Sequence, residues 1–232
     1  MKKILITSGG TREYIDGVRV LTNISSGKLG AKIADYFLSS GDPNHHSSYY
    51  GSVPEKYDVH YVYVKGSEFP SYMSAIRKHF KSYEVTDVQS VYDIMEKLVP
   101  EMDIVIHPMA VSDFGFKPIN TKLKSNDTEA FIESMKERIY QTPKILSHIK
   151  EWNSNCFLIS FKFEDGLTHE ELIKIAADSQ LKNKSDIVIA NDKKEMQEKK
   201  SHIAYFLKDG VEICSCNSKE EISYKIFDIL NK

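Results

Sequence analysis

Residues 4–30 read ILITSGGTREYIDGVRVLTNISSGKLG, and this stretch decides the fold. It starts with an apolar run suited to a buried strand, continues as a long polar loop and ends at the start of a helix. Gly9 and Gly10 allow the backbone to turn off the strand and approach a ligand closely, because glycine has no Cβ. Ser25–Gly27 would place free N–H groups at the helix N-terminus, where anions are favoured. The stretch therefore predicts a binding site for a phosphate or a carboxylate.

The rest of the chain alternates helical and strand patterns. Stripes of apolar residues predict helices over Gly27–Ser39 and Val88–Leu98. Further helix starts are predicted at Thr142-Pro143, read as an N-cap followed by proline at the first helical position, and at capping boxes that begin with Thr168 and Ser218. Apolar runs suited to buried parallel strands lie at Lys3–Thr7, Val59–Val64, Asp103–Ile106, Phe157–Phe161 and Asp186–Ala190.

This alternation predicts an α/β fold with a Rossmann-like, doubly wound and mainly parallel sheet. Ligands of such sheets bind beyond the carboxyl ends of the strands, near a switch in strand order, and the segments after Thr7 and Ile106 both lie at such ends.

Three other segments complete the outline. Ser201–Leu207 and Val211–Cys214 flank the turn signal Lys208-Asp209-Gly210, so an antiparallel C-terminal hairpin is expected at one edge. Asp42–Tyr57 is expected to be a long loop. Asp192–Lys200 is interpreted as a solvated loop in preference to a binding patch.

Length and composition narrow the class of protein. The 232 residues, 41% of them hydrophobic, can bury one sizeable core, so residues 1–232 are predicted to form a single domain. A formal net charge of −2 provides no broad footprint for nucleic acid. The sequence shows neither a secretory leader nor a membrane-spanning run, which predicts a soluble, cytoplasmic protein. Cys156, Cys214 and Cys216 are interpreted as buried or incidental thiols.

Two polar segments carry the candidate chemistry. The first loop lacks G-x-G-x-x-G, which disfavours a nicotinamide cofactor. Arg19 can grip a phosphate or carboxylate and Asn23 an amide or acyl oxygen, the alternatives being a surface ion pair and a helix cap. The second segment is Ile106–Phe114, followed by Lys122–Lys124. Its Asp113 can accept hydrogen bonds from ribose hydroxyls, and Lys122 can bind nucleotide phosphates, unless Lys122 is an ordinary edge-strand lysine. His107 is left outside the catalytic set.

The first segment resembles the phosphopantothenate–cysteine ligase family, the phosphopantothenoylcysteine synthetases of coenzyme A biosynthesis. Members carry T-x-G-x-T-x-E-x-x-D-x-V-R-x-x-x-N-x-S-S-G-x-x-G there. The counterparts in this chain are Thr7, Gly9, Thr11, Glu13, Asp16, Val18, Arg19, Asn23, Ser25, Ser26, Gly27 and Gly30. The resemblance implies that Asn23 holds an activated acyl intermediate and that Arg19 supports that site.

Other segments extend the resemblance along most of the chain. Met109–Asp113 resembles A-A-V-A-D, Lys122–Lys124 resembles K-I-K, and Thr142–Leu146 resembles N-P-D-I-L. The resemblance implies Asn23, Lys122 and Arg19 as catalytic residues and no metal ligand. The implied substrate- or nucleotide-binding residues are Gly9, Gly10, Thr11, Ser25, Ser26, Gly27, Met109, Ala110, Asp113, Thr142, Pro143, Lys144, Ile145, Phe161 and Lys182.

The implied reaction joins 4′-phosphopantothenate to L-cysteine through an acyl-nucleotidylate, using a nucleoside triphosphate with Mg²⁺ and neither flavin nor NAD. A homodimer of the free-standing bacterial form is expected. CTP is favoured over ATP. However, Ser179 and Asn183 stand where CTP-using relatives carry two lysines, and Lys182 is a possible substitute for one of them. Lys162, next to Phe161, is an addition to the family pattern. These departures leave the choice of nucleotide open.

Two other functions remain open at this stage. One is a nicotinamide-dependent oxidoreductase on a Rossmann-like fold, which the first loop disfavours. The other is a non-catalytic nucleotide-binding module, which the departures at Ser179 and Asn183 suggest.

Overall fold

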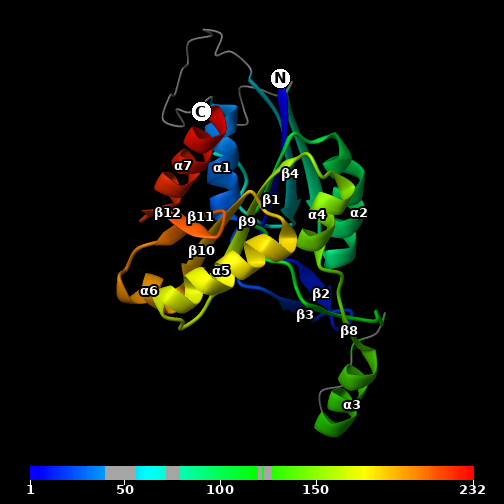
Figure 1. Cartoon of the computed structure of the whole chain (residues 1–232). Helices are drawn as coiled ribbons and strands as arrows, with labels where there is room; N and C mark the ends of the chain where they lie inside the picture. The colour runs from blue at the N-terminus through cyan, green and yellow to red at the C-terminus, as the bar shows by residue number, and fades with distance from the viewer. Residues whose placement is uncertain (40–55, 72–78, 120–121, 123–126) are drawn as a thin grey trace.

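The computed structural model describes residues 1–39, 56–71, 79–119, 122 and 127–232 (Figure 1). At its centre is an eight-stranded sheet with the order β12-β11-β10-β9-β6-β1-β4-β5. Residues 4–8 of β1 (Lys2–Ser8) are buried because both faces of the strand are covered, which explains their apolar run. The other strands are β4 (Tyr57–Val64), β5 (Phe80–Val85), β6 (Ile104–His107), β9 (Phe157–Glu164), β10 (Ile187–Asp192), β11 (Ala204–Lys208) and β12 (Val211–Cys216).

The predicted fold class and C-terminal hairpin are confirmed. The strands from β5 to β10 pair in parallel, and β11 runs antiparallel to both of its neighbours. The β11–β12 turn places Asp209 and Gly210 at φ values of 52° and 76°, as a tight hairpin turn requires. All five predicted strands are present, whereas β5 is not among the predicted strands.

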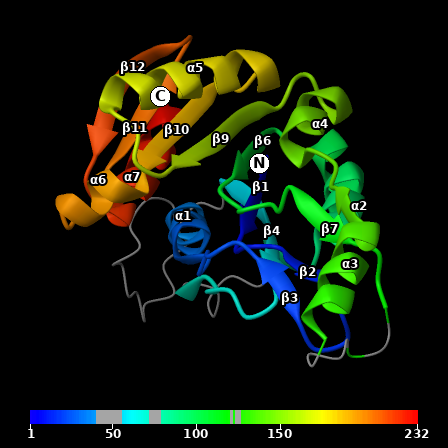
Figure 2. The same cartoon turned by 90° about the horizontal axis from the view of Figure 1, so that it is seen from below.

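Helices cover both faces of the sheet (Figures 1 and 2). α1 (Lys28–Leu38) and α7 (Lys219–Asn231) lie side by side on one face. α1 packs on β1 and β4 and α7 contacts β12, and Ile33, Phe37, Ile222 and Ile226 belong to one apolar cluster. The other face is covered by α2 (Val88–Leu98), α4 (Ile145–Trp152) and α5 (His169–Asn183). The short 3-10 helix Val99–Glu101 follows α2.

Local hydrogen bonds fix the helix starts. Thr168 and Glu171 form the predicted capping box of α5, and Ser218 caps α7 as predicted. The predicted start at Thr142 is wrong: the N-cap of α4 is Lys144, and the Thr142 hydroxyl donates to the carbonyl of Ser112. A tertiary hydrogen bond thus takes the side chain that the sequence assigned to the cap.

Two of the predicted loops have different outcomes. Lys193–Glu198 forms α6, so the interpretation of Asp192–Lys200 as a loop is wrong; Asp192 caps this helix by accepting from Glu195 N–H. The predicted loop at 42–57 falls outside the described residues, except that Lys56 is described and Tyr57 already begins β4.

A feature absent from the sequence predictions projects below the sheet in Figure 1. It consists of the described residues of 12–24 and 114–141, here called the arm. The arm contains two antiparallel pairs and one helix. These elements are β2 (Arg12–Tyr14), β3 (Val20–Thr22), β7 (Phe114–Phe116), α3 (Thr128–Arg138) and β8 (Ile139–Gln141).

Two buried charged side chains fix the root of the arm. The Glu13 carboxylate accepts a hydrogen bond from Val88 N–H at 2.8 Å, at the N-terminus of α2, and burial raises the pKa of this carboxyl group. The Arg138 guanidinium donates to the carbonyls of Ile15 (2.7 Å) and Lys117 (3.0 Å). The Glu13 bond joins the arm to the body of the protein, and the Arg138 bonds tie α3 to both segments of the arm.

Among the described residues, no helix has the length and apolar character needed to cross a membrane. Cys156 and Cys216 are buried, Cys214 is half-buried, and all three are free thiols, which agrees with their interpretation from the sequence.

Candidate functional site at the strand switch

The strand order reverses between β1 and β6, because the chain passes from β1 to β4 on one side and later returns to β6 on the other. Such a reversal leaves a crevice outside the carboxyl ends of the two strands. Both polar segments singled out from the sequence meet there. Gly10 and Ala110 form a parallel bridge, Ala110 N–H donates to Gly9 O (2.9 Å), and Thr11 N–H donates to Ala110 O (3.0 Å).

Asn23 closes over this bridge. A Cβ on Gly10 would overlap the backbone carbonyl oxygen of Asn23, so the loop can approach this closely only over glycine. The side-chain amide of Asn23 donates to Val111 O at 3.2 Å. The structure therefore places Asn23 in contact with the second segment, 88 residues further along the chain.

The turn before α1 is also shaped by glycine. Gly9 and Gly27 adopt φ values of 93° and 77°, in the left-handed region that favours glycine. Gly27 is the N-cap of α1, and its carbonyl accepts from the Ser8 hydroxyl at 2.9 Å. Ser26 O accepts from Glu68 N–H at 2.9 Å, which holds the loop against the end of β4. Ser25, Ser26 and Gly27 thus lie at a helix N-terminus, as predicted.

A buried hydrogen-bonded pair spans the crevice. His107 Nδ1 and Thr7 Oγ1 lie 2.8 Å apart, and Met109 N–H donates to Thr7 Oγ1 at 3.3 Å. Burial lowers the pKa of His107 to about 4, so the imidazole is neutral at pH 7. Because the Thr7 oxygen accepts from Met109, its own proton is available for Nδ1 of the neutral ring. This pair fixes the segment that leads to Ala110.

An exposed ion pair marks the rim of the crevice. The ammonium of Lys144 contacts the Asp113 carboxylate, and both side chains are more than half exposed. Thr142 N–H donates to Asp113 O at 3.1 Å, which holds the start of α4 beside the second segment. Met109 and Ile145 are buried in the core. Thr11 is buried as well, and its hydroxyl accepts from Ser112 N–H at 2.9 Å.

Two of the predicted catalytic residues lie outside the crevice. Arg19 is on the arm, where its guanidinium pairs with Asp16 at 3.3 Å and lies over the Phe131 ring, 5.2 Å from its centroid. Lys122 is exposed in the connection between β7 and α3, and forms neither a hydrogen bond nor an ion pair with any described residue. Asn23 is the member of this set that reaches the crevice.

The residues considered for nucleotide choice lie on both faces of the sheet. Phe161 packs with the α1 and α7 layer, and Lys162 on the same strand pairs with Glu164 at 2.8 Å. Lys182 is exposed in the last turn of α5, which ends where β10 begins. In the last turn of the same helix, the side-chain amide of Asn183 donates to Ser179 O at 2.8 Å. The structure thus separates Lys182 from the crevice.

Three further basic side chains were not among the sequence predictions. α1 and α7 each place a lysine, Lys28 and Lys219, at the first helical position, and half-buried His202 precedes the nearby strand β11. Cations are disfavoured at helix N-termini, so lysines directly after Gly27 and Ser218 were a usable signal. Their proximity to each other depends on tertiary packing.

Comparison with known proteins agrees with this geometry. The family model described as "DNA/pantothenate metabolism flavoprotein C-terminal domain" matches residues 1–69 and 58–232. The chain belongs to this family. The matched residues include both segments that meet at the strand switch, together with α1 and α7.

Among curated relatives, the Coenzyme A biosynthesis bifunctional protein CoaBC of Thermococcus kodakarensis is 30% identical over 100% of this chain and 51% of its own length. The protein of the same name from Methanocaldococcus jannaschii is 28% identical over 99% of this chain and 50% of its own. The chain thus spans about half the length of the curated relatives it matches.

Among solved structures, the DNA/pantothenate metabolism flavoprotein from Streptococcus pneumoniae is 28% identical with a TM-score of 0.77, covering 100% of this chain and 99% of that one. A Cab2 mutant in complex with phosphopantothenate-cysteine shares the fold with a TM-score of 0.70 at 16% identity, covering 99% of this chain and 88% of that one. The first of these similarities agrees with the family assignment, and both support the fold.

Proposed function

We propose that residues 1–232 act as a single phosphopantothenate–cysteine ligase domain in coenzyme A biosynthesis. The observation that carries the proposal is the contact between the two family segments, in which Gly10 bridges Ala110 and Asn23 bonds to Val111. The names of the CoaBC relatives and of the Cab2 complex support the substrate class.

The proposed reaction has two steps. The carboxylate of 4′-phosphopantothenate attacks the α-phosphorus of a nucleoside triphosphate, and pyrophosphate leaves. The amine of L-cysteine then attacks the acyl carbon, an amide bond forms, and the nucleoside monophosphate leaves. Both steps depend on positioning and on offsetting negative charge, because no nucleophilic side chain of the chain is needed.

Each side chain of the crevice has a defined task in this proposal. Asn23 orients the acyl group of the intermediate through its amide, which is already held toward the second segment by Val111. Backbone N–H groups near Gly9 and Gly10 and the α1 N-terminus at Ser26 stabilise phosphate charge. Asp113, released from Lys144, accepts from a ribose hydroxyl. Arg19 and Lys122 act on phosphates from the arm and its connection.

The described residues contain no group of three or more His, Cys, Asp or Glu side chains that could hold a metal ion. In the proposal Mg²⁺ would come with the nucleotide and would neutralise part of the charge of its phosphates.

The arm supports a homodimer. Nine of its large apolar side chains are exposed, and exposed apolar surface is typical of protein–protein contacts. They are Tyr14, Val18, Val20, Leu21, Ile24, Phe114, Ile132, Ile139 and Tyr140. In the proposal a second copy covers this surface and so holds Arg19 and Lys122 in place.

A pyrophosphate-release assay tests the function. The protein is incubated with phosphopantothenate, Mg²⁺ and either CTP or ATP, with and without cysteine. Release that requires phosphopantothenate, and amide product that requires cysteine, are expected, with CTP preferred in kcat/KM. Binding of nucleotide without pyrophosphate release would instead indicate a nucleotide-binding module.

Asn23→Ala makes the test specific to the crevice. Loss of one preorganised donor typically costs on the order of 10²–10³ in rate. We expect that loss in cysteine-dependent turnover, with nucleotide affinity retained. Lys174→Gln, an exposed change on α5, is the matched control and should keep full activity. Wild-type turnover in Asn23→Ala would remove Asn23 from the proposed site.

A further inference from the structure

Three contacts in succession join the two polar segments where they leave the sheet. The first is the parallel bridge at Gly10, and the second is the bond from Ser112 N–H to the Thr11 hydroxyl at 2.9 Å. The third lies on the arm, where β2 contacts β7 and a Cβ on Gly115 would lie 3.2 Å from the Glu13 carboxylate. The crevice and the root of the arm are therefore one continuous ladder between the same two stretches of chain.

Glu13 is the charged member of this ladder. It is buried, and its carboxylate accepts from Val88 N–H at the start of α2 but forms no ion pair with any residue that the structure describes. Burial raises its pKa, the bond from Val88 lowers it, and the charge of Asp87 raises it further. The positive end of the α2 dipole thus faces a buried carboxylate that is costly to keep ionised.

The bonds of β2 attach the ladder to a rigid element. Arg12 N–H donates to Thr86 O at 2.8 Å, so two successive residues of β2 are held to the chain that enters α2. Val88 and Val91 of that helix are buried in the core. On the far side, a Cβ on Gly115 would lie 2.8 Å from the Tyr140 ring, so β7 has no room to move away from Tyr140 or from Glu13.

We propose that ionised Glu13 is a positioning residue: it holds the arm on α2 and so sets the separation of the two segments at Gly10 and Ala110. A carboxylate accepts a shorter and stronger bond from an N–H group than a neutral acceptor does, so the charge matters in addition to the shape. The assignment to turnover rests on the proposed ligase function, whereas the effect on the geometry of the crevice does not.

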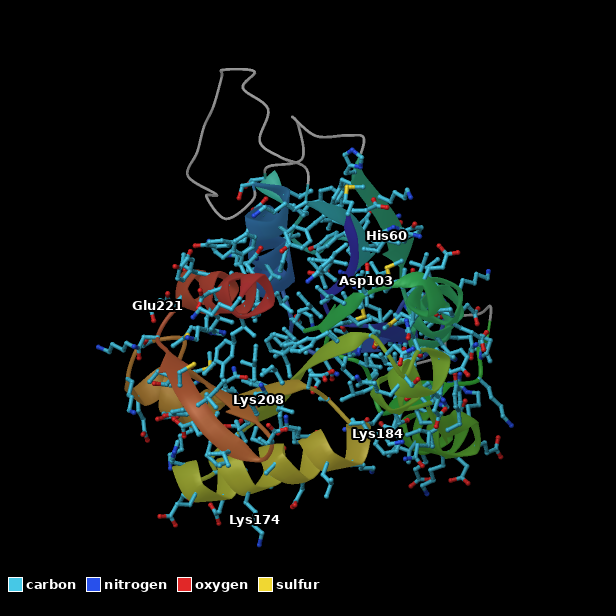
Figure 3. All side chains as sticks on the ribbon, turned by 45° about the horizontal axis from the view of Figure 1, so that its top comes forward. His60, Asp103, Lys174, Lys184, Lys208 and Glu221 are labelled. Carbon is cyan, nitrogen blue, oxygen red and sulfur yellow. The ribbon has the colours of Figure 1, made fainter. Side chains whose placement is uncertain are left out.

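Glu13→Gln tests the charge, because glutamine keeps the size and an acceptor oxygen. We expect kcat in the pyrophosphate-release assay to fall by about tenfold or more, with a change of less than about threefold in the KM for nucleotide. Asp103→Asn is the matched control. Its carboxylate also accepts from a backbone N–H, that of Lys3 at 2.7 Å, but it lies just before β6, at the amino ends of the strands (Figure 3). The control should turn over like the wild type.

The pH dependence of turnover separates charge from shape. The titratable groups that face Glu13 are Asp87 at the start of α2 and Tyr140 on β8, whose pKa is raised by burial and by the Glu13 charge. In the wild type, kcat should fall on the acid side as Glu13 takes up a proton, at a pH above the usual carboxyl pKa of 4.5. Glu13→Gln should lack this acid limb, and Asp103→Asn should retain it.

Thermal unfolding distinguishes positioning from a structural role. Because the folded-state pKa of Glu13 is raised, its contribution to stability is present below the unfolded pKa and is lost as the pH rises through the folded one. Glutamine stays neutral, so at pH 7 the Tm of Glu13→Gln should equal or exceed that of the wild type. A lower Tm together with lower turnover would mean that Glu13 is structural and would overturn the proposal.

Hydrogen exchange measures the crevice without turnover. The amide protons of Thr11, Ala110 and Ser112 carry bonds of the ladder and should exchange about tenfold faster in Glu13→Gln than in the wild type and the control. Wild-type kcat and exchange in Glu13→Gln, in a protein with ligase turnover, would overturn the positioning role and leave the ligase intact. Faster exchange in a protein without turnover would support the positioning role and overturn the ligase.

Discussion

The crevice between β1 and β6 is closed by buried groups, whereas the arm below it exposes apolar side chains to solvent. In the crevice, Thr7, His107 and Thr11 are buried, and each side chain bonds to a group of the adjacent segment. On the arm, Ile24 is fully exposed and Val18 is 64% exposed. The geometry of the crevice is therefore held by contacts within one chain, whereas the arm leaves apolar side chains exposed. In the proposed homodimer, a second copy would cover the arm but would not be needed to form the crevice.

The largest effect is expected from Gly10→Ala, which breaks the crevice. The added Cβ would overlap the Asn23 carbonyl, so the two loops must separate. A displacement of about 1 Å can cost on the order of 10² in rate, and we expect at least that loss in pyrophosphate release. Gly166→Ala is the control: unlike Gly10, Gly166 has a left-handed φ of 91°, but nothing lies within 4 Å of a Cβ added there, so this variant tests backbone strain without overlap. Equal activity of the two variants would contradict the assignment.

His107→Asn tests whether the interior of the crevice is buried. The folded-state pKa of His107, about 4, lies below its usual value of 6.5, so its contribution to stability is present above pH 6.5 and lost as the pH falls toward 4. That loss amounts to roughly 3 kcal/mol in the wild type. The variant should show a flatter dependence of the unfolding free energy on pH, and the slope that remains comes from the other groups with shifted pKa values, among them His60, His202 and Glu13.

Urea unfolding at several pH values between 4 and 7.5 measures this slope. His148→Asn is the control, since His148 is partly exposed on α4 and pairs with Glu151 at 2.7 Å. An unchanged slope in His107→Asn would mean that the ring is not buried in its neutral form.

Ile24→Asp tests whether the arm is the surface through which two copies associate. In the proposed homodimer, a charge on the apolar surface of the arm should weaken self-association at least tenfold, which light scattering over a range of concentrations would detect. The free energy of unfolding of the chain should change by less than about 0.5 kcal/mol, because the side chain is fully exposed. Leu181→Asp on α5 makes the same change at an exposed apolar residue outside the arm and should leave association unchanged. Equal association of both variants would exclude the arm as the dimer surface.

The smallest effect is expected at the rim. Lys144 and Asp113 are exposed on 56% and 60% of their side-chain surface. Exposed ion pairs contribute about 0–1 kcal/mol, so a double-mutant cycle with Lys144→Gln and Asp113→Asn should give a coupling free energy within that range. A coupling above about 2 kcal/mol would show that the rim is desolvated like the interior of the crevice.

Local patterns explain why the body of the protein was predictable. The parallel strands are buried on both faces and therefore read as apolar runs, as in β1 and β10. The Thr168 capping box and the Asp209-Gly210 turn act through neighbouring residues, so the sequence shows them directly. The same locality places Gly9, Gly10 and Gly27 at the turn before α1.

The sequence by itself determined the α/β class, the glycine turn and the two segments that carry the family pattern. The tertiary structure alone decided that Thr142 bonds to Ser112 instead of capping α4, that Lys182 lies away from the crevice, and that Lys28 and Lys219 share one edge. The physical reason is the separation in sequence between the interacting groups. Apolar periodicity and caps depend on residues a few positions apart, whereas these contacts join groups far apart in sequence, whose partners are known only once the sheet has set its strand order.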